Sequence, residues 1–81
     1  MRVTVKLFAR LRDLVGAGDL TRDAPAGATA RQVWDALAAE HPSLVPYARV
    51  TSCAVNAEYA PFSTPLQEGD EVAFLPPVSG G

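Results

Sequence analysis

The sequence predicts a small α+β domain in which a mixed β-sheet wraps around one main helix. Residues 2–8 alternate apolar and polar side chains with the period of a strand, and an amphipathic helix with a capping signal follows near residue 29. The last third returns to short strand-like segments separated by turn residues. The 81 residues show no repeat and no linker, so we expect one domain with a modest core.

The N-terminal part is expected to form a strand, a short helix and a second strand. Residues 2–8 place their valines and Leu7 on one face of the first strand. Apolar residues then recur at helical spacing between Leu11 and Val15, and Gly16 can end this helix after about two turns. A weaker strand is expected around residues 20–24.

The strongest helix signal begins at Thr29, which forms a capping-box pattern with Gln32. An apolar stripe follows at helical spacing, made of Val33, Trp34, Leu37 and Ala38. Pro42 ends this helix. Residues 43–50 have no clear period and are expected to form a loop or a single turn.

Three short strands are expected in the last third, at residues 52–55, 59–62 and 71–75, separated by turns at 56–58 and 67–70. Val72 and Phe74 point inward in the last of them. If this strand pairs beside the first, it lies centrally and holds the chain rigidly as far as Leu75. The chain is therefore divided into a domain, residues 1–75, and a flexible tail, residues 76–81.

Composition excludes several classes of protein. Apolar residues make up 48% of the chain, and no apolar run approaches the roughly 20 residues of a membrane span. Met1 leads directly into an alternating charged segment rather than into a secretory signal. The single cysteine cannot form an internal disulfide. We therefore expect a cytoplasmic protein that does not associate with membranes.

Charge is unevenly distributed along the chain. Four of the seven basic residues lie in the first twelve positions and none follows Arg49, whereas the last third carries Glu58, Glu68, Asp70 and Glu71. This acidic third argues against a nucleic-acid surface. It indicates either a partner with basic groups or a solvated acidic face.

Conventional catalytic sites are poorly supported. His41 is the only histidine and lies in the last turn of the main helix, where interaction with the helix dipole explains it. Cys53 lies in an apolar strand and is interpreted as a core thiol. The sequence has no zinc-ligand spacing and no glycine-rich phosphate loop, so no bound metal or cofactor is expected.

The chemistry is therefore predicted at the tail. Pro76 and Pro77 stop strand pairing and stiffen the exit from the domain. The residues that follow are small, so the tail can thread a narrow channel and end in the carboxylate of Gly81. Attack of that carboxylate on the α-phosphate of ATP would form an acyl adenylate, which a sulfur nucleophile could convert to a thiocarboxylate. The alternative is an ordinary loose chain end.

The sequence resembles the small subunit of molybdopterin synthase, a ubiquitin-like sulfur carrier. The resemblance covers the whole chain and is carried by residues 8–16, by Ala54-Val55-Asn56 and by Gly69-Asp70-Glu71-Val72-Ala73-Phe74. The ending Leu75-Pro76-Pro77-Val78-Ser79-Gly80-Gly81 is the most specific part.

This resemblance implies a β-grasp fold and a defined reaction. An E1-like enzyme would use ATP to adenylate Gly81, and sulfur would be installed there. The tail would then enter the large subunit, which supplies the catalytic side chains, and donate sulfur to cyclic pyranopterin monophosphate (precursor Z). Two small and two large subunits would form the assembly. The residues expected to contact the partner are Phe74, Leu75, Pro76, Pro77, Val78, Ser79 and Gly80. Many relatives have an aromatic residue where this chain has Leu75, so an apolar contact is retained there but not a stacking one.

Three alternatives remain open at this point. A thiamine-pathway sulfur carrier would use the same terminal chemistry for thiazole assembly. A ubiquitin-like modifier would be joined through Gly81 to lysines of target proteins. An interaction domain with an inert tail would keep its function after removal of Gly80 and Gly81, whereas a carrier would lose it.

Overall fold

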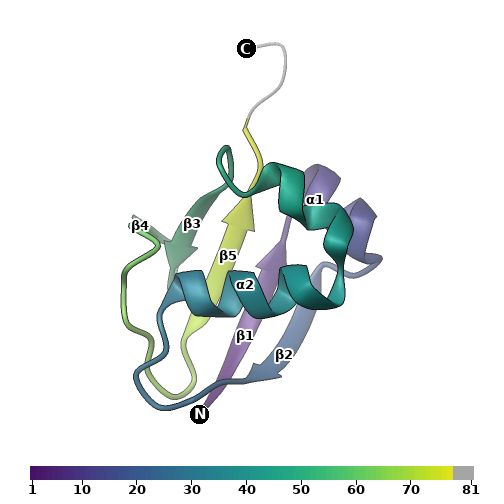
Figure 1. The fold of residues 1–81 in the computed structure, drawn as a ribbon. Helices are drawn as coiled ribbons and strands as arrows, with labels where there is room; N and C mark the ends of the chain where they lie inside the picture. Colours follow the sequence, from purple (N-terminus) through teal and green to yellow (C-terminus); the bar gives the residue numbers. More distant parts are fainter. Residues whose placement is uncertain (78–81) are drawn as a thin grey trace.

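The computed structural model describes residues 1–77 and contains one mixed sheet, two α-helices and a 3₁₀ helix (Figure 1). In chain order the elements are β1 (Arg2–Leu7), α1 (Ala9–Val15), β2 (Asp19–Asp23), α2 (Ala30–Glu40), η1 (Pro42–Tyr47), β3 (Ser52–Val55), β4 (Glu58–Ala60) and β5 (Glu71–Leu75). The five-stranded sheet and the single main helix confirm the predicted α+β roll.

The sheet has the strand order β2-β1-β5-β3-β4. Its two central strands, β1 and β5, are parallel, and Leu7 lies opposite Phe74. The other neighbours pair antiparallel, so β5 is held on both sides, with Ser52 of β3 opposite Leu75. This confirms the central position predicted for the last strand.

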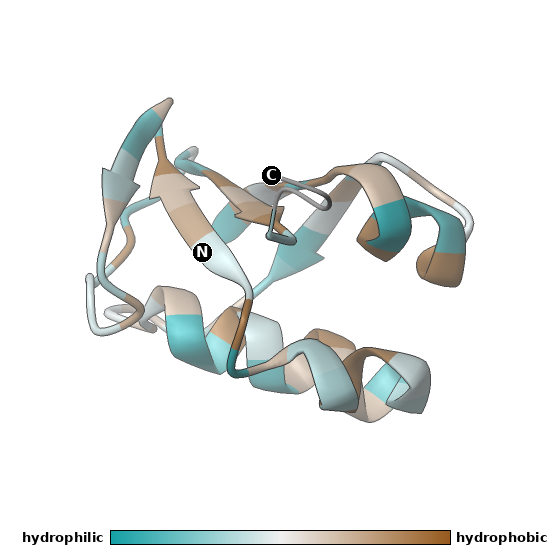
Figure 2. Ribbon diagram, turned by 90° about the horizontal axis from the view of Figure 1, so that it is seen from above, coloured by the Kyte–Doolittle hydropathy of each residue, from teal (hydrophilic) through white to brown (hydrophobic). Residues whose placement is uncertain are grey.

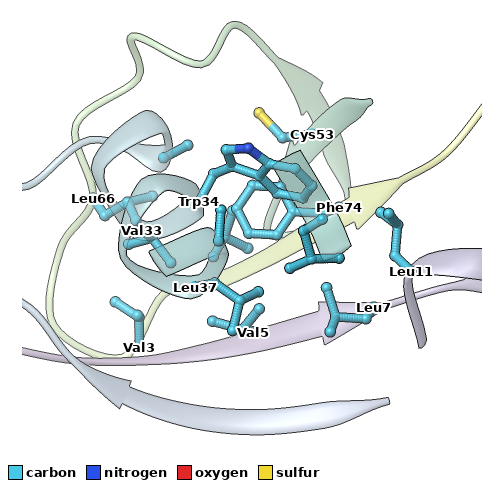
Figure 3. Packing of buried hydrophobic residues seen from close by; sticks show 14 residues of the cluster. Val3, Val5, Leu7, Leu11, Val33, Trp34, Leu37, Cys53, Leu66 and Phe74 are labelled. Carbon is cyan, nitrogen blue, oxygen red and sulfur yellow. The ribbon is translucent and has the colours of Figure 1, made fainter. Parts of the chain in front are cut away.

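One face of the sheet packs against α2, which lies in a separate layer beneath it (Figure 2). The alternation predicted for β1 is observed, because Val3, Val5 and Leu7 are at most 2% exposed. Trp34 of α2 and Phe74 make a T-shaped contact with their ring centroids 5.1 Å apart (Figure 3). Phe62 stacks on the same ring at 5.9 Å. The aromatic side chain of β5 is therefore clamped between the helix and the loop that follows β4.

Both predicted helix boundaries are confirmed by their capping contacts. The amide of Gln32 donates to Thr29 Oγ1 at 3.3 Å and the amide of Thr29 donates to Gln32 Oε1 at 2.8 Å, which completes the capping box. At the end of α1, Gly16 has φ +86° and its amide donates to the carbonyl of Arg12.

Two segments differ from the sequence expectation. Residues Pro42–Tyr47 form the 3₁₀ helix η1 rather than a loop or single turn, because Leu44 is fully buried and pulls this segment onto the core. The strand β4 begins at Glu58 and ends at Ala60, where Pro61 follows and limits pairing.

Among residues 1–77, no helix has the length and apolar character needed to cross a membrane.

Candidate functional site

The candidate site begins where β5 ends. Strands β1 and β5 point to the same end of the sheet, and α1 together with the segment between η1 and β3 lies beside that end (Figure 1). Leu75 is the last residue of β5 and pairs with Ser52. The tail therefore begins at the end of the central strand β5, which is hydrogen-bonded to β1 on one side and to β3 on the other.

Phe74 anchors this exit from inside. Phe74 is fully buried, and its ring packs on Trp34 and Phe62. The prediction that its side chain contacts a partner is therefore wrong, because a partner cannot reach the ring. The inward direction predicted for Phe74 explains this, since a side chain on the helix-facing side of a central strand cannot also face solvent. Its neighbour Leu75 points to the opposite face.

Some of the other residues predicted to contact a partner lie within residues 1–77, and the others follow them. Leu75 and Pro76 are partly exposed and Pro77 is exposed, so all three are available to a partner. The predicted contacts Val78, Ser79 and Gly80 and the predicted reactive residue Gly81 lie outside the described residues.

The exit is bordered by apolar side chains. Phe8 follows Leu7 at the end of β1 and is 44% exposed, and Val50, two residues before β3, is 51% exposed. Because Leu7 pairs with Phe74 and Ser52 with Leu75, both side chains come from segments that end at the tail exit. They are two of the four large apolar side chains that are exposed among the described residues; the other two, Val45 and Tyr59, lie on η1 and β4. Exposed apolar groups beside the exit give a second protein an apolar surface to bind.

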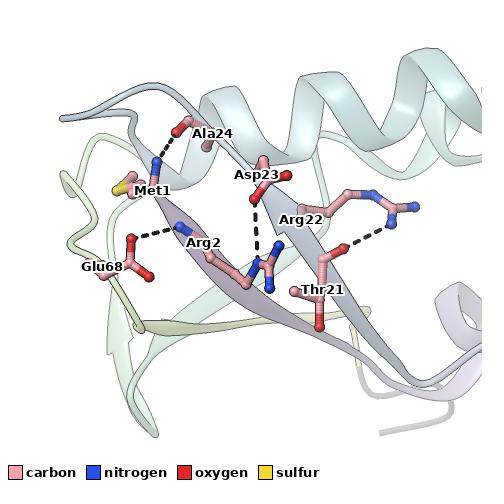
Figure 4. Close-up of polar contacts among 7 residues, drawn as sticks. All are labelled: Met1, Arg2, Thr21, Arg22, Asp23, Ala24 and Glu68. Atoms are coloured by element: carbon pink, nitrogen blue, oxygen red, sulfur yellow. Dashed lines mark hydrogen bonds and ion pairs between the residues drawn. The ribbon is translucent and has the colours of Figure 1, made fainter.

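The acidic residues of the last third lie at the other end of the sheet. Glu68, Asp70 and Glu71 precede or begin β5, whose course carries the chain away from them. The amide of Arg2, at the start of β1, donates to Glu68 Oε1 at 3.0 Å (Figure 4). A protein that receives the tail therefore need not contact these carboxylates, and the basic partner considered from the sequence is not required at the exit.

Neither of the other residues weighed as catalytic meets the requirements. Cys53 is 2% exposed, its thiol donates to the carbonyl of Ala60 at 3.1 Å, and burial raises its pKa, so the reactive thiolate is disfavoured. His41 forms the C-cap of α2. Within residues 1–77, no group of three or more His, Cys, Asp and Glu side chains is placed to hold a metal ion.

A pocket of about 110 Å³ lies between β2 and α2, lined in part by Ala24, Val33 and Leu37. Pockets for drug-sized ligands usually have at least about 300 Å³. This one is therefore too small to hold a nucleotide or a pterin on its own. A second hollow of about 440 Å³ lies along β3 and β4, beside Cys53, Tyr59 and Phe62, but it is shallow and largely open to solvent. Neither hollow encloses a ligand of substrate size.

Comparison with known proteins gives concordant matches. The model of the ThiS family matches residues 5–81. A molybdopterin synthase sulfur carrier subunit from Arabidopsis thaliana is 41% identical over 81 residues, which cover all of this chain and 84% of the relative.

Solved structures show the same fold. The crystal structure of the small archaeal modifier protein SAMP1 from Haloferax volcanii superposes with a TM-score of 0.85 at 33% identity, covering 100% of both chains. A chain in the complex of subunits 1 and 2 of the molybdopterin-converting factor from Helicobacter pylori matches with a TM-score of 0.70 at 27% identity, again covering 100% of both chains. The predicted ubiquitin-like β-grasp fold is thereby confirmed.

Proposed function

The chain belongs to the ThiS family, and from this premise we propose that it is the sulfur-carrier subunit of a molybdopterin synthase. The observation that carries the proposal is the identity of 41% over the full chain with a protein of that name. The geometry agrees with a carrier role, since β5 leads directly to the tail and is anchored in the core by Phe74.

In the proposed reaction the chain supplies one group, the carboxylate of Gly81. An E1-like enzyme would adenylate it with ATP, and a sulfur donor would displace AMP to leave a thiocarboxylate. The thiocarboxylate would then transfer its sulfur to cyclic pyranopterin monophosphate. The catalytic side chains would belong to the large subunit.

The domain's contribution is to position the tail. The Trp34–Phe74–Phe62 contacts fix the end of β5, so binding at the exit does not have to order that strand. Leu75, Pro76 and Pro77 would form the described part of the interface, with Phe8 and Val50 at its border. We propose a large-subunit partner because the matched Helicobacter pylori chain belongs to a complex of two subunits. A heterotetramer of two small and two large subunits remains part of the proposal.

The proposal is tested by reconstituting sulfur transfer. The chain would be loaded with sulfur, mixed with the large subunit and cyclic pyranopterin monophosphate, and assayed for molybdopterin. Wild-type chain should give product, whereas Gly81→Ala, whose added Cβ crowds a channel fitted to bare backbone, should fold normally but load sulfur poorly. A loaded wild-type chain that forms no molybdopterin but supports thiazole assembly would identify the thiamine-pathway carrier instead.

A second function is favoured by the likeness to SAMP1, a protein named as a modifier. In that case Gly81 would become linked to lysine side chains of other proteins. Isopeptide-linked fragments carrying the C-terminal residues of this chain, recovered from cells that express it, would support the modifier. Their absence, together with molybdopterin synthesis in the reconstituted system, would support the carrier alone.

A further inference from the structure

The chain has one lysine, and it lies beside the strand that carries the tail. Lys6 is on β1, opposite Ala73 of β5 and two positions before Leu75 in the register. It alternates with the buried Val5 and Leu7, so its side chain is on the face of the sheet that α2 does not cover. The one lysine amine of the chain is therefore close to the start of the tail.

Carboxylates from both neighbouring strands hold this amine. Lys6 Nζ lies 3.1 Å from Asp19 Oδ1 of β2 and 3.9 Å from Glu71 Oε1 of β5. The hydrogen bond to Asp19, followed by the charges of Asp19 and Glu71, raises the pKa of Lys6. Arg12 of α1 lines the same depression as Lys6 and Asp19.

Stability does not explain this arrangement well. The side chains of Asp19 and Glu71 are 72% and 39% exposed, and ion pairs this open contribute little to stability because water screens them. The pairs do have a chemical consequence, because they favour the ammonium form and occupy its donors. An ammonium has no lone pair and cannot attack an acyl group.

Under the proposed function, a free amine on the carrier could attack the carrier's own activated C-terminus. Six residues follow Leu75, and a chain of six residues can span up to about 20 Å. An activated Gly81 could therefore return to Lys6, where attachment to one molecule gives an effective concentration of the order of millimolar. The amine would attack the acyl carbon, the bond to AMP would break, AMP would leave with the electron pair and the nitrogen proton would pass to water. The product would be a lactam that can carry no sulfur.

Resting on the proposed function, we propose that Asp19 and Glu71 are specificity-determining residues that withhold Lys6 from the activated C-terminus. They keep the acyl group for a sulfur nucleophile and prevent the carrier from closing on itself. The fixed φ angles of Pro76 and Pro77 act in the same direction, since they resist the bend that closure requires.

The test uses the full chain bearing a C-terminal thioester, prepared by intein cleavage, so that no activating enzyme is needed. During incubation the thioester either hydrolyses to the free acid or closes to the lactam, whose mass is one water lower. In Asp19→Asn/Glu71→Gln the ratio of lactam to acid should be several-fold higher than in wild type, with Asp19→Asn and Glu71→Gln alone falling between. Peptide mapping should find the new bond between Lys6 and Gly81.

Two controls accompany these variants. Adding Lys6→Arg to the double variant should abolish the lactam. Asp35→Asn, which removes the carboxylate paired with Arg31 on α2, should leave the ratio at the wild-type value. Equal ratios in wild type and double variant, or no lactam in either, would overturn the inference. Because the thioester is made without an activating enzyme, this result does not depend on whether an enzyme loads Gly81 with sulfur. Enzymatic loading is the separate test of the proposed function.

Discussion

At one end of the sheet, the side chains of Asn56, Glu68 and Asp70 accept hydrogen bonds from backbone amides of neighbouring segments, whereas the other end has the exposed apolar side chains of Phe8 and Val50 on the segments beside the end of β5. The amide of Gln67 donates to Asp70 Oδ2 at 2.8 Å, and the amide of Glu71 donates to Asn56 Oδ1 at 3.0 Å. The polar side chains at the first end therefore have hydrogen-bond partners within the chain itself. The apolar end has exposed groups that a second protein can cover, which is why we assign function to it.

The largest effect should come from the tail itself. Deletion of Gly80 and Gly81 should abolish sulfur loading while leaving the free energy of unfolding unchanged, because neither residue belongs to the domain predicted for residues 1–75. Mass spectrometry after incubation with the activating enzyme would measure loading, and urea denaturation would measure stability. Retained function in the truncated chain would favour an interaction domain with an inert tail.

Removing the anchor beneath the exit should be the next largest effect. Phe74→Ala would leave a cavity between Trp34 and Phe62 and should lower the free energy of unfolding by about 3 to 5 kcal/mol. Urea denaturation would measure the loss. A loss below 1 kcal/mol would mean that the aromatic contacts do not fix β5.

The polar end offers a matched comparison. Asn56→Ala removes the bond from Asn56 Nδ2 to Asp70 Oδ1, at 3.0 Å, and the acceptor for the amide of Glu71. The lost hydrogen bonds should cost about 1 to 2 kcal/mol of stability, and the φ of +50° at this position, which asparagine tolerates better than alanine, acts in the same direction. Sulfur loading of the folded protein should be normal, because the site is at the end away from the exit. A folded Asn56→Ala protein with impaired loading would break the division between the two ends.

Cys53→Ala gives a smaller and purely structural effect. The thiol is buried, so its loss should cost up to about 2 kcal/mol through packing while sulfur transfer stays at the wild-type rate. The transfer assay with the large subunit would measure this. Loss of transfer in the folded variant would place a reactive thiol where we place a core side chain.

The smallest effect should be a gain. In the turn between β3 and β4, Asn56 and Ala57 have φ of +50° and +71°. Alanine is strained in this region, so Ala57→Gly should stabilise the protein by about 0.5 to 1 kcal/mol. A small rise in the urea midpoint would be the readout, and a fall would indicate that backbone entropy outweighs the strain.

Much of the fold could be predicted because local signals and tertiary packing agree. The alternation of β1 and the capping box at Thr29 specified their elements directly. The 3₁₀ helix η1 was missed because two prolines obscure any period and only burial of Leu44 holds the segment in place. The turn at 56–58 was predicted, but its left-handed backbone was not, because Ala57 stands where a glycine would have marked that conformation.

The site was only partly predictable for a related reason. Phe74 and Leu75 are adjacent in sequence, yet the pleat of β5 puts the first in the core and leaves the second partly exposed. Likewise Asp70 is near the tail in sequence, but the five residues of β5 carry the chain about 15 Å away from it. The contacts of Lys6 with both neighbouring strands depend on the strand order and could not be inferred from any local motif.

The most direct test of the central claim, that the chain carries sulfur on its C-terminus, is an intact-mass spectrum after incubation with ATP, a sulfur donor and the activating enzyme. The account predicts a gain matching the exchange of one oxygen for sulfur, localised to Gly81 in the C-terminal fragment. An unchanged mass, beside a known carrier loaded in parallel, would contradict it.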